Sequence, residues 1–254
     1  MSVVLIQSNP TIARELPANP DEILHIAEFF YDTVQGEGIN IGVPAAFLRL
    51  QHCTLSCVWC DTKQVWRYGN PYSFAELCTM IEVSGLLQKL RNGQHLVLTG
   101  GSPLRQQTAL IYFIRYFNNI FGFTPYIEIE NECTLMPSVF FEIYVSCWNN
   151  SPKLSSSGNR RSERYKPVIL SKLASYENSW FKFVVSCVTD WEEIRMDFLD
   201  TNLISKDQII LMPQGATREE LFKNRQVVVD MAIKYSVRYS TREHIVLWDK
   251  MTGV

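Results

Sequence analysis

Three cysteines lie close together in the chain, at a spacing that suits a metal centre. Cys53, Cys57 and Cys60 are separated by three and then two residues, so one tight loop can direct all three sulfurs at a single centre. Thiolates are soft ligands that select zinc, copper(I) or iron–sulfur clusters. A [4Fe–4S] cluster normally takes four cysteines. Three would leave one iron open to a ligand from outside the protein.

The same cysteines leave a zinc site open as an alternative. In a zinc knuckle His52 would be the fourth ligand, but its neighbour Cys53 faces the site, and adjacent side chains point apart. A zinc ribbon would bring a second CxxC pair, which the sequence lacks. The four other cysteines are scattered and are predicted to be small buried residues: Cys78, Cys133, Cys147 and Cys187.

Composition bounds the class of protein. The chain has 254 residues, 46% of them hydrophobic, which suits one large domain or two small ones with a sizeable core. A net charge of −2 offers no basic field for nucleic acid, so a pocket must select the partner. No signal peptide and no apolar run of ~18 residues is evident. The odd, clustered cysteine count fits a reducing compartment. We expect a soluble cytoplasmic protein that binds neither nucleic acid nor membrane.

Short apolar runs rich in β-forming residues alternate with helical stretches, and these elements must position the cysteines. Strands are predicted at residues 45–50, 95–99, 126–130, 143–146, 180–185 and 208–212, with one more at 244–248. Near-continuous apolar strands separated by helices predict parallel βα units. Six strands are too few for a closed eight-stranded barrel, so we predict an α/β fold with an open or partial barrel. Its chemistry should lie at the C-terminal strand ends, where the cysteine loop follows the first strand.

Capping signals and composition set the other boundaries. Capping boxes at 73–76 and 217–220 predict helices that run to about Leu90 and Tyr235. Pro103 fits the first turn of a helix reaching Phe121, and Thr189 or Asp190 caps a helix through Leu199. Residues 1–24, with three prolines, are predicted to be an irregular arm, and residues 25–254 a core domain with a C-terminal substrate-binding segment. Residues 153–165 are predicted to be an exposed, solvated loop.

CTLSCVWC resembles the CxxxCxΦC motif of the radical S-adenosylmethionine (SAM) superfamily, with Trp59 in the aromatic position. The resemblance implies a partial (β/α)6 barrel and a [4Fe–4S] cluster on Cys53, Cys57 and Cys60, shielded by Trp59. It also implies that SAM chelates the fourth iron through its amino and carboxylate groups. One electron from the cluster then cleaves the sulfonium, and a 5′-deoxyadenosyl radical takes a hydrogen from the substrate.

Further motifs narrow the resemblance to one family. QGEG at 35–38, CDT at 60–62, TGG at 99–101, SPK at 151–153, MPQG at 212–215 and the C-terminal H-x3-W…GV segment resemble the 7-carboxy-7-deazaguanine synthase family over about residues 26–254. TGG with CxxxCxxC occurs across the superfamily, whereas the combination is specific. The resemblance implies conversion of 6-carboxy-5,6,7,8-tetrahydropterin to 7-carboxy-7-deazaguanine with loss of ammonia, in queuosine and deazapurine biosynthesis. SAM is used catalytically and Mg²⁺ assists.

The resemblance also implies which residues bind the cofactor. They are Trp59, Gly100, Gly101, Ser102, Glu130, Ser151, Lys153 and Gln214. In the superfamily an acidic residue often follows the two glycines, and this chain has Ser102 there. Glu130 matches the Glu of the family's ETNGT-like stretch, in which Cys133 replaces the usual glycine. We expect Cys133 to be a small packing residue, because a fourth thiolate would block SAM.

Substrate contacts are implied in the same way. They are Gln35, Gly36, Glu37, Gly38, Arg49, Gly101, His244 and the C-terminal carboxylate of Val254. Amide, carboxylate and guanidinium groups suit the mixed donor–acceptor edge and the carboxylate of a pterin. Arg49 and Lys182 lie in strands, where an inward charge needs a partner. Thr62 is implied as the magnesium contact, since a single hydroxyl beside waters and substrate oxygens suits Mg²⁺. Asp61 beside it is either a tuning group or a turn residue.

Other functions remain open at this stage. Another small radical SAM enzyme, such as a glycyl-radical activase, shares CxxxCxxC but is not expected to carry QGEG or the H-x3-W segment. A non-enzymatic zinc-binding module would use the cysteines alone. The family resemblance implies a flavodoxin or ferredoxin as reductant and a homodimer. The sequence does not distinguish a tRNA from a DNA pathway for the product.

Overall fold

The computed structural model describes residues 22–251 and Gly253, and the other residues lie outside this description. The described residues form one sheet of nine strands, in the order β3-β1-β2-β4-β5-β6-β7-β8-β9. The strands are β1 (Ile23–Val34), β2 (Pro44–Leu50), β3 (Asn70–Ser73), β4 (His95–Gly100), β5 (Ile127–Asn131), β6 (Cys147–Asn150), β7 (Ser179–Val185), β8 (Ile209–Pro213) and β9 (Arg238–Tyr239). The predicted arm therefore falls mostly outside the description, and its last residues, Ile23 and Leu24, belong to β1.

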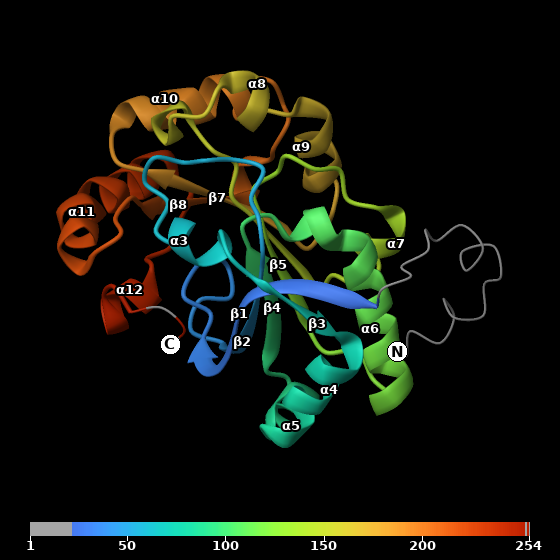
Figure 1. Ribbon diagram of the computed structural model, residues 1–254. Helices are drawn as coiled ribbons and strands as arrows, with labels where there is room; N and C mark the ends of the chain where they lie inside the picture. Colours follow the sequence, from blue (N-terminus) through green and yellow to red (C-terminus); the bar gives the residue numbers. More distant parts are fainter. Residues whose placement is uncertain (1–21, 252, 254) are drawn as a thin grey trace.

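Helices follow most of the strands and lie around the outside of the sheet (Figure 1). The α-helices are α3 (Lys63–Trp66), α4 (Phe74–Val83), α5 (Leu86–Arg91), α6 (Gln107–Phe121), α7 (Val139–Glu142), α8 (Arg161–Arg164), α9 (Pro167–Ala174), α10 (Val188–Ile194), α11 (Arg218–Tyr235) and α12 (Glu243–Trp248). Short 3₁₀ turns are η1 (Pro103–Gln106), η2 (Ser155–Ser157) and η4 (Lys206–Gln208), and η3 (Arg195–Leu199) is a π-helical turn that prolongs α10.

Six consecutive strands, β2, β4, β5, β6, β7 and β8, pair in parallel, as the sequence predicts. The antiparallel pairs β1–β2 and β1–β3 extend one edge, and β9 adds a parallel pair at the other. The edge strands β3 and β9 do not pair with each other, so the described sheet is open. This confirms the α/β partial barrel.

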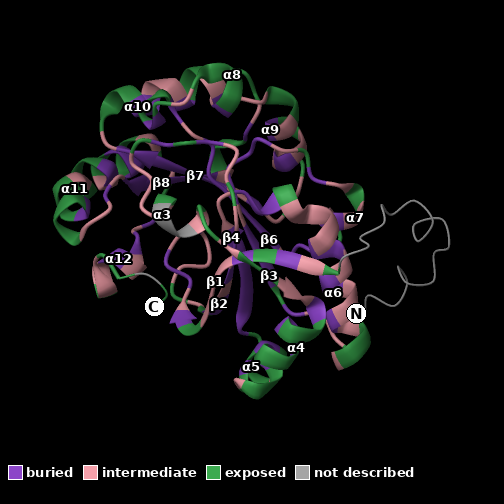
Figure 2. Cartoon of the chain, in the orientation of Figure 1, coloured by how far each residue is buried: buried purple, intermediate pink, exposed green. Residues whose placement is uncertain are grey.

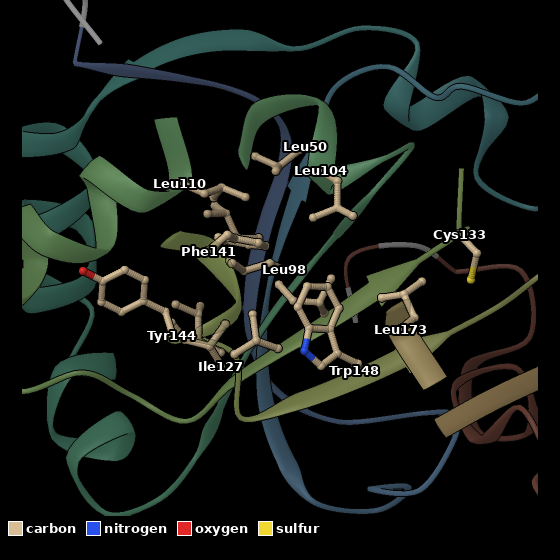
Figure 3. Packing of buried hydrophobic residues seen from close by; sticks show 14 of the residues in the cluster. Leu50, Leu98, Leu104, Leu110, Ile127, Cys133, Phe141, Tyr144, Trp148 and Leu173 are labelled. Carbon is tan, nitrogen blue, oxygen red and sulfur yellow. The ribbon is translucent and has the colours of Figure 1, made fainter. Parts of the chain in front are cut away.

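Successive residues of a strand face opposite sides of the sheet. Leu48 and Leu50 of β2, like Leu96 and Leu98 of β4, belong to the hydrophobic core beneath the helices. Arg49 and Thr99, which alternate with them, line a cavity on the other face. Figure 3 shows this core, where Leu98, Ile127 and Trp148 meet Leu110 and Phe141, and Figure 2 shows the buried strands inside the exposed helices.

Two predicted strands were wrong. Residues 143–146 lie before β6, whose pairing begins at Cys147, because Ile143 ends α7 and stays partly exposed. Residues 244–248 are β-rich in composition but form α12, whose backbone starts from Arg242: the amides of Ile245 and Val246 donate to the Arg242 carbonyl.

Three other predictions need correction. The helix expected to run from Ser73 to Leu90 is broken by Gly85, which has φ +75° between α4 and α5. Cys187 caps α10, not Thr189 or Asp190, and the Asp190 carboxylate accepts from the Ser186 and Cys187 amides. The segment 153–165 is not simply a solvated loop, because Ser157 and Arg164 are buried and Arg164 pairs with Glu193.

Candidate active site

One cavity of about 590 Å³ lies over the C-terminal ends of the parallel strands. All three cysteines of the CxxxCxxC loop line it, and so does Arg49 on β2. Lys182 on β7 and His244 on α12 line the same cavity, so residues from both ends of the chain meet there. The parallel order of the strands causes this, because their C-terminal ends share one edge of the sheet.

Hydrogen-bond donors surround the cysteine sulfurs. The Leu55 amide lies 3.4 Å and the Ser102 hydroxyl 3.7 Å from Cys53 Sγ. Asn159 Nδ2 donates to Cys57 Sγ over 3.2 Å. Because such donors tune and hold iron–sulfur thiolates, this donor set fits an iron–sulfur cluster. No group of three His, Cys, Asp or Glu side chains in the described part is arranged to hold a single metal ion.

The segment that was predicted to be a solvated loop holds the cysteine loop in place. Asn159 accepts the Ser56 amide over 2.9 Å, and the Ser157 carbonyl accepts the Val58 amide over 3.0 Å. Trp59 Nε1 donates to the Ser156 carbonyl at 3.1 Å. Residues 156–159 therefore hold the cysteine loop through three hydrogen bonds.

Burial raises the pKa of the Cys53 and Cys57 thiols. Both are therefore protonated at neutral pH in the protein without metal. Loading of a cluster must release these protons, since thiolates are the ligands.

The Gly100–Gly101 turn supports the cysteine loop by close backbone approach. A Cβ on Gly101 would overlap the carbonyl of His52 and the amide of Cys53. Gly100 has φ +137° and packs equally closely against the Leu50 backbone. Ser102, which follows, is fully buried, and its hydroxyl accepts the Thr54 amide at 3.0 Å. Both glycines line the cavity, while Ser102 lies behind the loop and does not.

A buried ion network forms the centre of the cavity floor. Lys182, 1% exposed, donates to Glu37 Oε2 over 2.7 Å and to Glu130 Oε2. Arg242 Nε donates to the other oxygen of Glu37 at 2.9 Å. The anionic partner expected for Lys182 is therefore a pair of carboxylates, one from the QGEG segment and one from β5.

The network sets the charge of its members. Burial alone would raise the pKa of Glu37, but the charges of Lys182 and Arg242 hold it well below its usual range. Burial raises the pKa of Glu130 despite its contact with Lys182. Burial also works against the charge of Lys182, yet its carboxylate partners raise its pKa, so it stays an ammonium at neutral pH.

Arg242 is a member of this site for which no role was predicted, and it pairs with Asp61, for which a tuning role and a plain turn role were both left open. Arg242 donates to Asp61 Oδ2 as well as to Glu37, and its NH1 group donates to the Gly215 carbonyl over 2.5 Å. One guanidinium thus ties the QGEG, CDT and MPQG segments together. Burial opposes ionisation of Asp61, but Arg242 lowers its pKa. The only sequence signal was an arginine beside the implied His244.

A second layer of polar groups lies below this network. Glu128 is fully buried and accepts from Gln35 Nε2 at 2.5 Å, Asn149 Nδ2 at 3.0 Å and Asn40 Nδ2 at 2.9 Å. The Gln35 and Asn149 amides also donate to Glu130 Oε1. These amides hold two strand carboxyl groups at fixed positions under the cavity.

An aromatic wall and an arginine form the part of the cavity nearest β1 and β2. Phe30 and Phe47 stack with their ring centroids 5.0 Å apart. Arg49, beside them, donates from Nε to Glu28 over 3.0 Å, which supplies the anionic partner it was expected to need. Gly253 lies against the same Glu28 carboxylate. Stacked rings beside a guanidinium suit a flat, anionic heterocycle.

His244 borders the same region and is uncharged at neutral pH. Burial, the largest cause, together with the neighbouring Arg242 lowers its pKa to about 4, and Glu37 only partly opposes this. The His244 ring packs against Gly36, where a Cβ would overlap Nδ1. Gly36 is therefore required because the His244 ring fills the space that a Cβ would need.

Most of the implied site residues line the cavity. They are Gln35, Gly36, Glu37, Arg49, Trp59, Thr62, Gly100, Gly101, Glu130, Ser151, Lys153 and His244, with the three cysteines. Gly38, Ser102 and Gln214 do not. Gly38 has φ +77° and packs against Asn149, and the Gln214 carbonyl accepts from Asn224 of α11. Val254 lies outside the described residues.

Cys133 packs in the hydrophobic core, as expected, and does not line the cavity. Its φ of +67° keeps the backbone in the left-handed region that a glycine would favour. The neighbouring Glu132 does line the cavity, although no role was predicted for it.

Comparison with known proteins gives consistent matches over most of the chain. Residues 34–129 match the family described as a 4Fe-4S single cluster domain. The chain is 30% identical over 223 residues to the 7-carboxy-7-deazaguanine synthase of Pyrobaculum aerophilum, covering 88% of this chain and 94% of that one. It is 30% identical to the enzyme of the same name from Rhodopirellula baltica, with coverage of 87% and 85%.

A solved structure agrees with these matches. The crystal structure of QueE from Escherichia coli superposes with a TM-score of 0.63 at 25% identity, covering 87% of this chain and 95% of that one. No helix in the part of the chain that the structure describes combines the length and apolarity needed to cross a bilayer.

Proposed function

The chain belongs to the 7-carboxy-7-deazaguanine synthase family, and from this membership we propose that it converts 6-carboxy-5,6,7,8-tetrahydropterin to 7-carboxy-7-deazaguanine with loss of ammonia. It is a radical SAM enzyme with an iron–sulfur cofactor. The observation that carries the proposal is a single cavity that combines three cysteines with a buried carboxylate–ammonium–guanidinium network.

The cysteine loop is the proposed cluster site, and cluster and SAM together supply the radical chemistry when bound. Cys53, Cys57 and Cys60 would hold three irons, and the Gly100–Gly101 turn keeps their loop at the strand ends. Trp59 and Lys153 close one side of this half of the cavity, with the ammonium 5.6 Å from the ring centroid. Lys153 also donates to Ser151 over 2.7 Å, and its ammonium would suit the carboxylate of a bound amino acid.

The other half of the cavity is the proposed pterin site. Phe30 and Phe47 offer a flat wall, and Arg49 offers the guanidinium that a ring carboxylate would require. His244 is neutral and can donate or accept a hydrogen bond without adding charge. Lys182 and Arg242 hold the Glu37 carboxylate in one orientation, so it is ready to accept N–H groups from a ring edge.

Mg²⁺ is proposed to bind beside Thr62. Thr62 lines the cavity next to Asp61, and its hydroxyl lies 3.9 Å from the Cys60 sulfur. A hydroxyl and a nearby carboxylate, completed by water and substrate oxygens, suit a cation that keeps much of its hydration. The reaction product measured with and without added Mg²⁺ tests this part separately.

The setting of the enzyme is proposed from the family resemblance. We infer a cytoplasmic location, a flavodoxin or ferredoxin as electron donor, and a homodimer. All seven cysteines are free thiols in the structure, which fits a reducing compartment.

The experiment is anaerobic reconstitution followed by turnover. The protein is loaded with iron and sulfide, then incubated with SAM, Mg²⁺, dithionite and 6-carboxytetrahydropterin, and the deazaguanine product is sought by mass. Cys187→Ala is the matched control for the cysteine loop, because Cys187 does not line the cavity. A colourless protein that holds zinc, or a brown protein that cleaves SAM without forming this product, would overturn the proposal.

A further inference from the structure

A buried carboxylate beside the cysteine loop lacks a partner for one of its oxygens. Glu132 follows β5 and is 5% exposed, and it lines the cavity. Its Oε1 accepts from the hydroxyls of Thr54 and Thr134 at 2.9 and 2.6 Å. Its Oε2 is buried and has no hydrogen-bond partner among the described residues. A buried carboxylate oxygen left in this state is costly, so the position calls for a donor from outside the chain.

The surrounding hydroxyls tie Glu132 to the cluster loop. The Ser102 hydroxyl lies 3.1 Å from that of Thr54, which in turn donates to Glu132. Ser102 is thus linked through one side chain to the carboxylate on the neighbouring strand. The position after the two glycines, which is often acidic in the superfamily, is Ser102 in this chain. Glu132 supplies a carboxyl group at the end of the next strand, in the same cavity.

The wall on this side also carries the opposite charge. Lys153 lines the cavity and donates to Ser151, and it forms no ion pair with Glu132 in the described part. Both side chains lie beside the cysteine loop: the Thr54 hydroxyl donates to Glu132, and the Lys153 ammonium lies 5.6 Å from the ring centroid of Trp59. One carboxylate and one ammonium that do not pair with each other, both beside this loop, match the charges of an α-amino acid zwitterion.

We propose that Glu132 binds the α-ammonium group of SAM, replacing the carboxylate that is absent at Ser102. This inference rests on the proposed radical SAM function. Lys153 then faces the α-carboxylate, so the two side chains select the amino acid end of the cofactor and orient it toward the cysteine loop. Glu132 is here a cofactor-binding residue, and its hydroxyl partners Thr54 and Thr134 are positioning residues.

The test is equilibrium binding to the cluster-loaded, unreduced enzyme, in which SAM is not cleaved. The dissociation constant of SAM is measured calorimetrically for the wild type and for Glu132→Gln, and again for a SAM analogue in which hydroxyl replaces the α-amino group. Because a hydrogen bond to a charged group is lost, Glu132→Gln should weaken SAM binding about 10- to 100-fold. It should change binding of the analogue less than about threefold, because no ammonium is present to be recognised.

Iron content and visible absorbance are measured first, and they should be unchanged in Glu132→Gln. Glu142→Gln, which removes a carboxylate outside the cavity, is the matched control and should bind both ligands like the wild type. Equal weakening of SAM and analogue would assign Glu132 a structural role and overturn the inference. So would unchanged SAM binding, which would mean that water satisfies Oε2. A wild type that loads no cluster or binds no SAM would instead refute the proposed function.

Discussion

Replacing Lys182 with methionine should strongly destabilise the protein. Lys182 is fully buried on β7 and bridges Glu37 and Glu130. After the replacement Glu37 still has Arg242, but Glu130 keeps only the neutral amides of Gln35 and Asn149. A buried carboxylate then lacks its cation, which typically costs about 3–5 kcal/mol. Domains of ordinary stability have about 5–15 kcal/mol in total.

The cost should depend on pH in a defined direction. Burial already raises the pKa of Glu130, and loss of Lys182 should raise it further. At a pH between the Glu130 pKa of the unfolded chain and that of the folded variant, the folded variant binds a proton that the unfolded chain does not. Lowering the pH therefore stabilises the folded variant. The difference between Lys182→Met and the wild type should therefore shrink as the pH falls from 8 toward 5.

Urea denaturation of the metal-free protein, followed by tryptophan fluorescence at pH 8 and pH 5.5, measures these free energies of unfolding. The double variant Lys182→Met/Glu130→Gln should recover about 2 kcal/mol at pH 8, since it removes the unpaired charge. Lys89→Met is the control, because Lys89 pairs with Asp32 at the exposed surface and should cost less than about 1 kcal/mol. Two results would show that Lys182 does not neutralise a buried Glu130: a loss of stability in Lys182→Met no larger than in Lys89→Met, or a further loss of stability when Glu130→Gln is added.

Four further changes test other parts of the site. Cys57→Ala should abolish cluster loading and SAM cleavage, as measured by iron content and release of 5′-deoxyadenosine. Gly101→Ala should greatly lower cluster loading while the protein stays folded, because the new Cβ would push the His52 backbone away; Gly85→Ala, where a Cβ meets nothing within 4 Å, should load normally. Deletion of residues 253–254 should raise the KM for the pterin while SAM cleavage without substrate persists. A normal KM would show that these residues do not bind the pterin. As the pH falls from 6.5 to 4, His244→Asn should lose less free energy of unfolding in urea titrations than the wild type does. The difference should be on the order of 1 kcal/mol, because the His244 side chain is one-third exposed and solvent screens part of the effect.

The sign of the His244 effect follows from its lowered pKa. Between pH 6.5 and about 4 the unfolded chain binds a proton that the folded protein does not, so the wild type loses stability as the pH falls through this window. Asn cannot take up that proton. A variant with the same acid sensitivity as the wild type would show that folding does not lower the pKa of His244.

The sequence predicts those parts of the fold whose pattern follows from burial on one or both faces. Five of the six parallel strands were recognisable because helices cover them and make them apolar. β6 was misplaced for the opposite reason: its residues Asn149 and Asn150 are polar because they belong to hydrogen-bond networks. β1 was missed because Glu28 and Asp32 interrupt its apolar pattern, and Glu28 is there to pair with Arg49.

The site was predictable where local spacing carries the chemistry. The cysteine loop and the glycine turn are compact motifs, and the structure places both at one cavity. Arg242 and Asp61 lie far apart in the sequence, and their pairing exists only after the strand ends have been brought together. No role was predicted for Glu132, because only the fold shows that one of its oxygens is buried without a hydrogen-bond partner among the described residues.

The balance of charge in the cavity links these findings to the proposed ligands. Four carboxyl groups lie on or beneath its floor with two cations between them: Glu37, Asp61, Glu128 and Glu130 with Lys182 and Arg242. The amides of Gln35, Asn40 and Asn149 donate to Glu128, and His95 Nδ1 lies 3.3 Å from its Oε2. A floor with more carboxylates than cations attracts positive ligands. A sulfonium cofactor and a divalent cation supply such charge, and Mg²⁺ would in addition let a carboxylated pterin approach the floor. The same imbalance supports the binding of SAM and Mg²⁺ in one cavity. Glu132 lies outside the floor, and we assign it to the α-ammonium group of SAM.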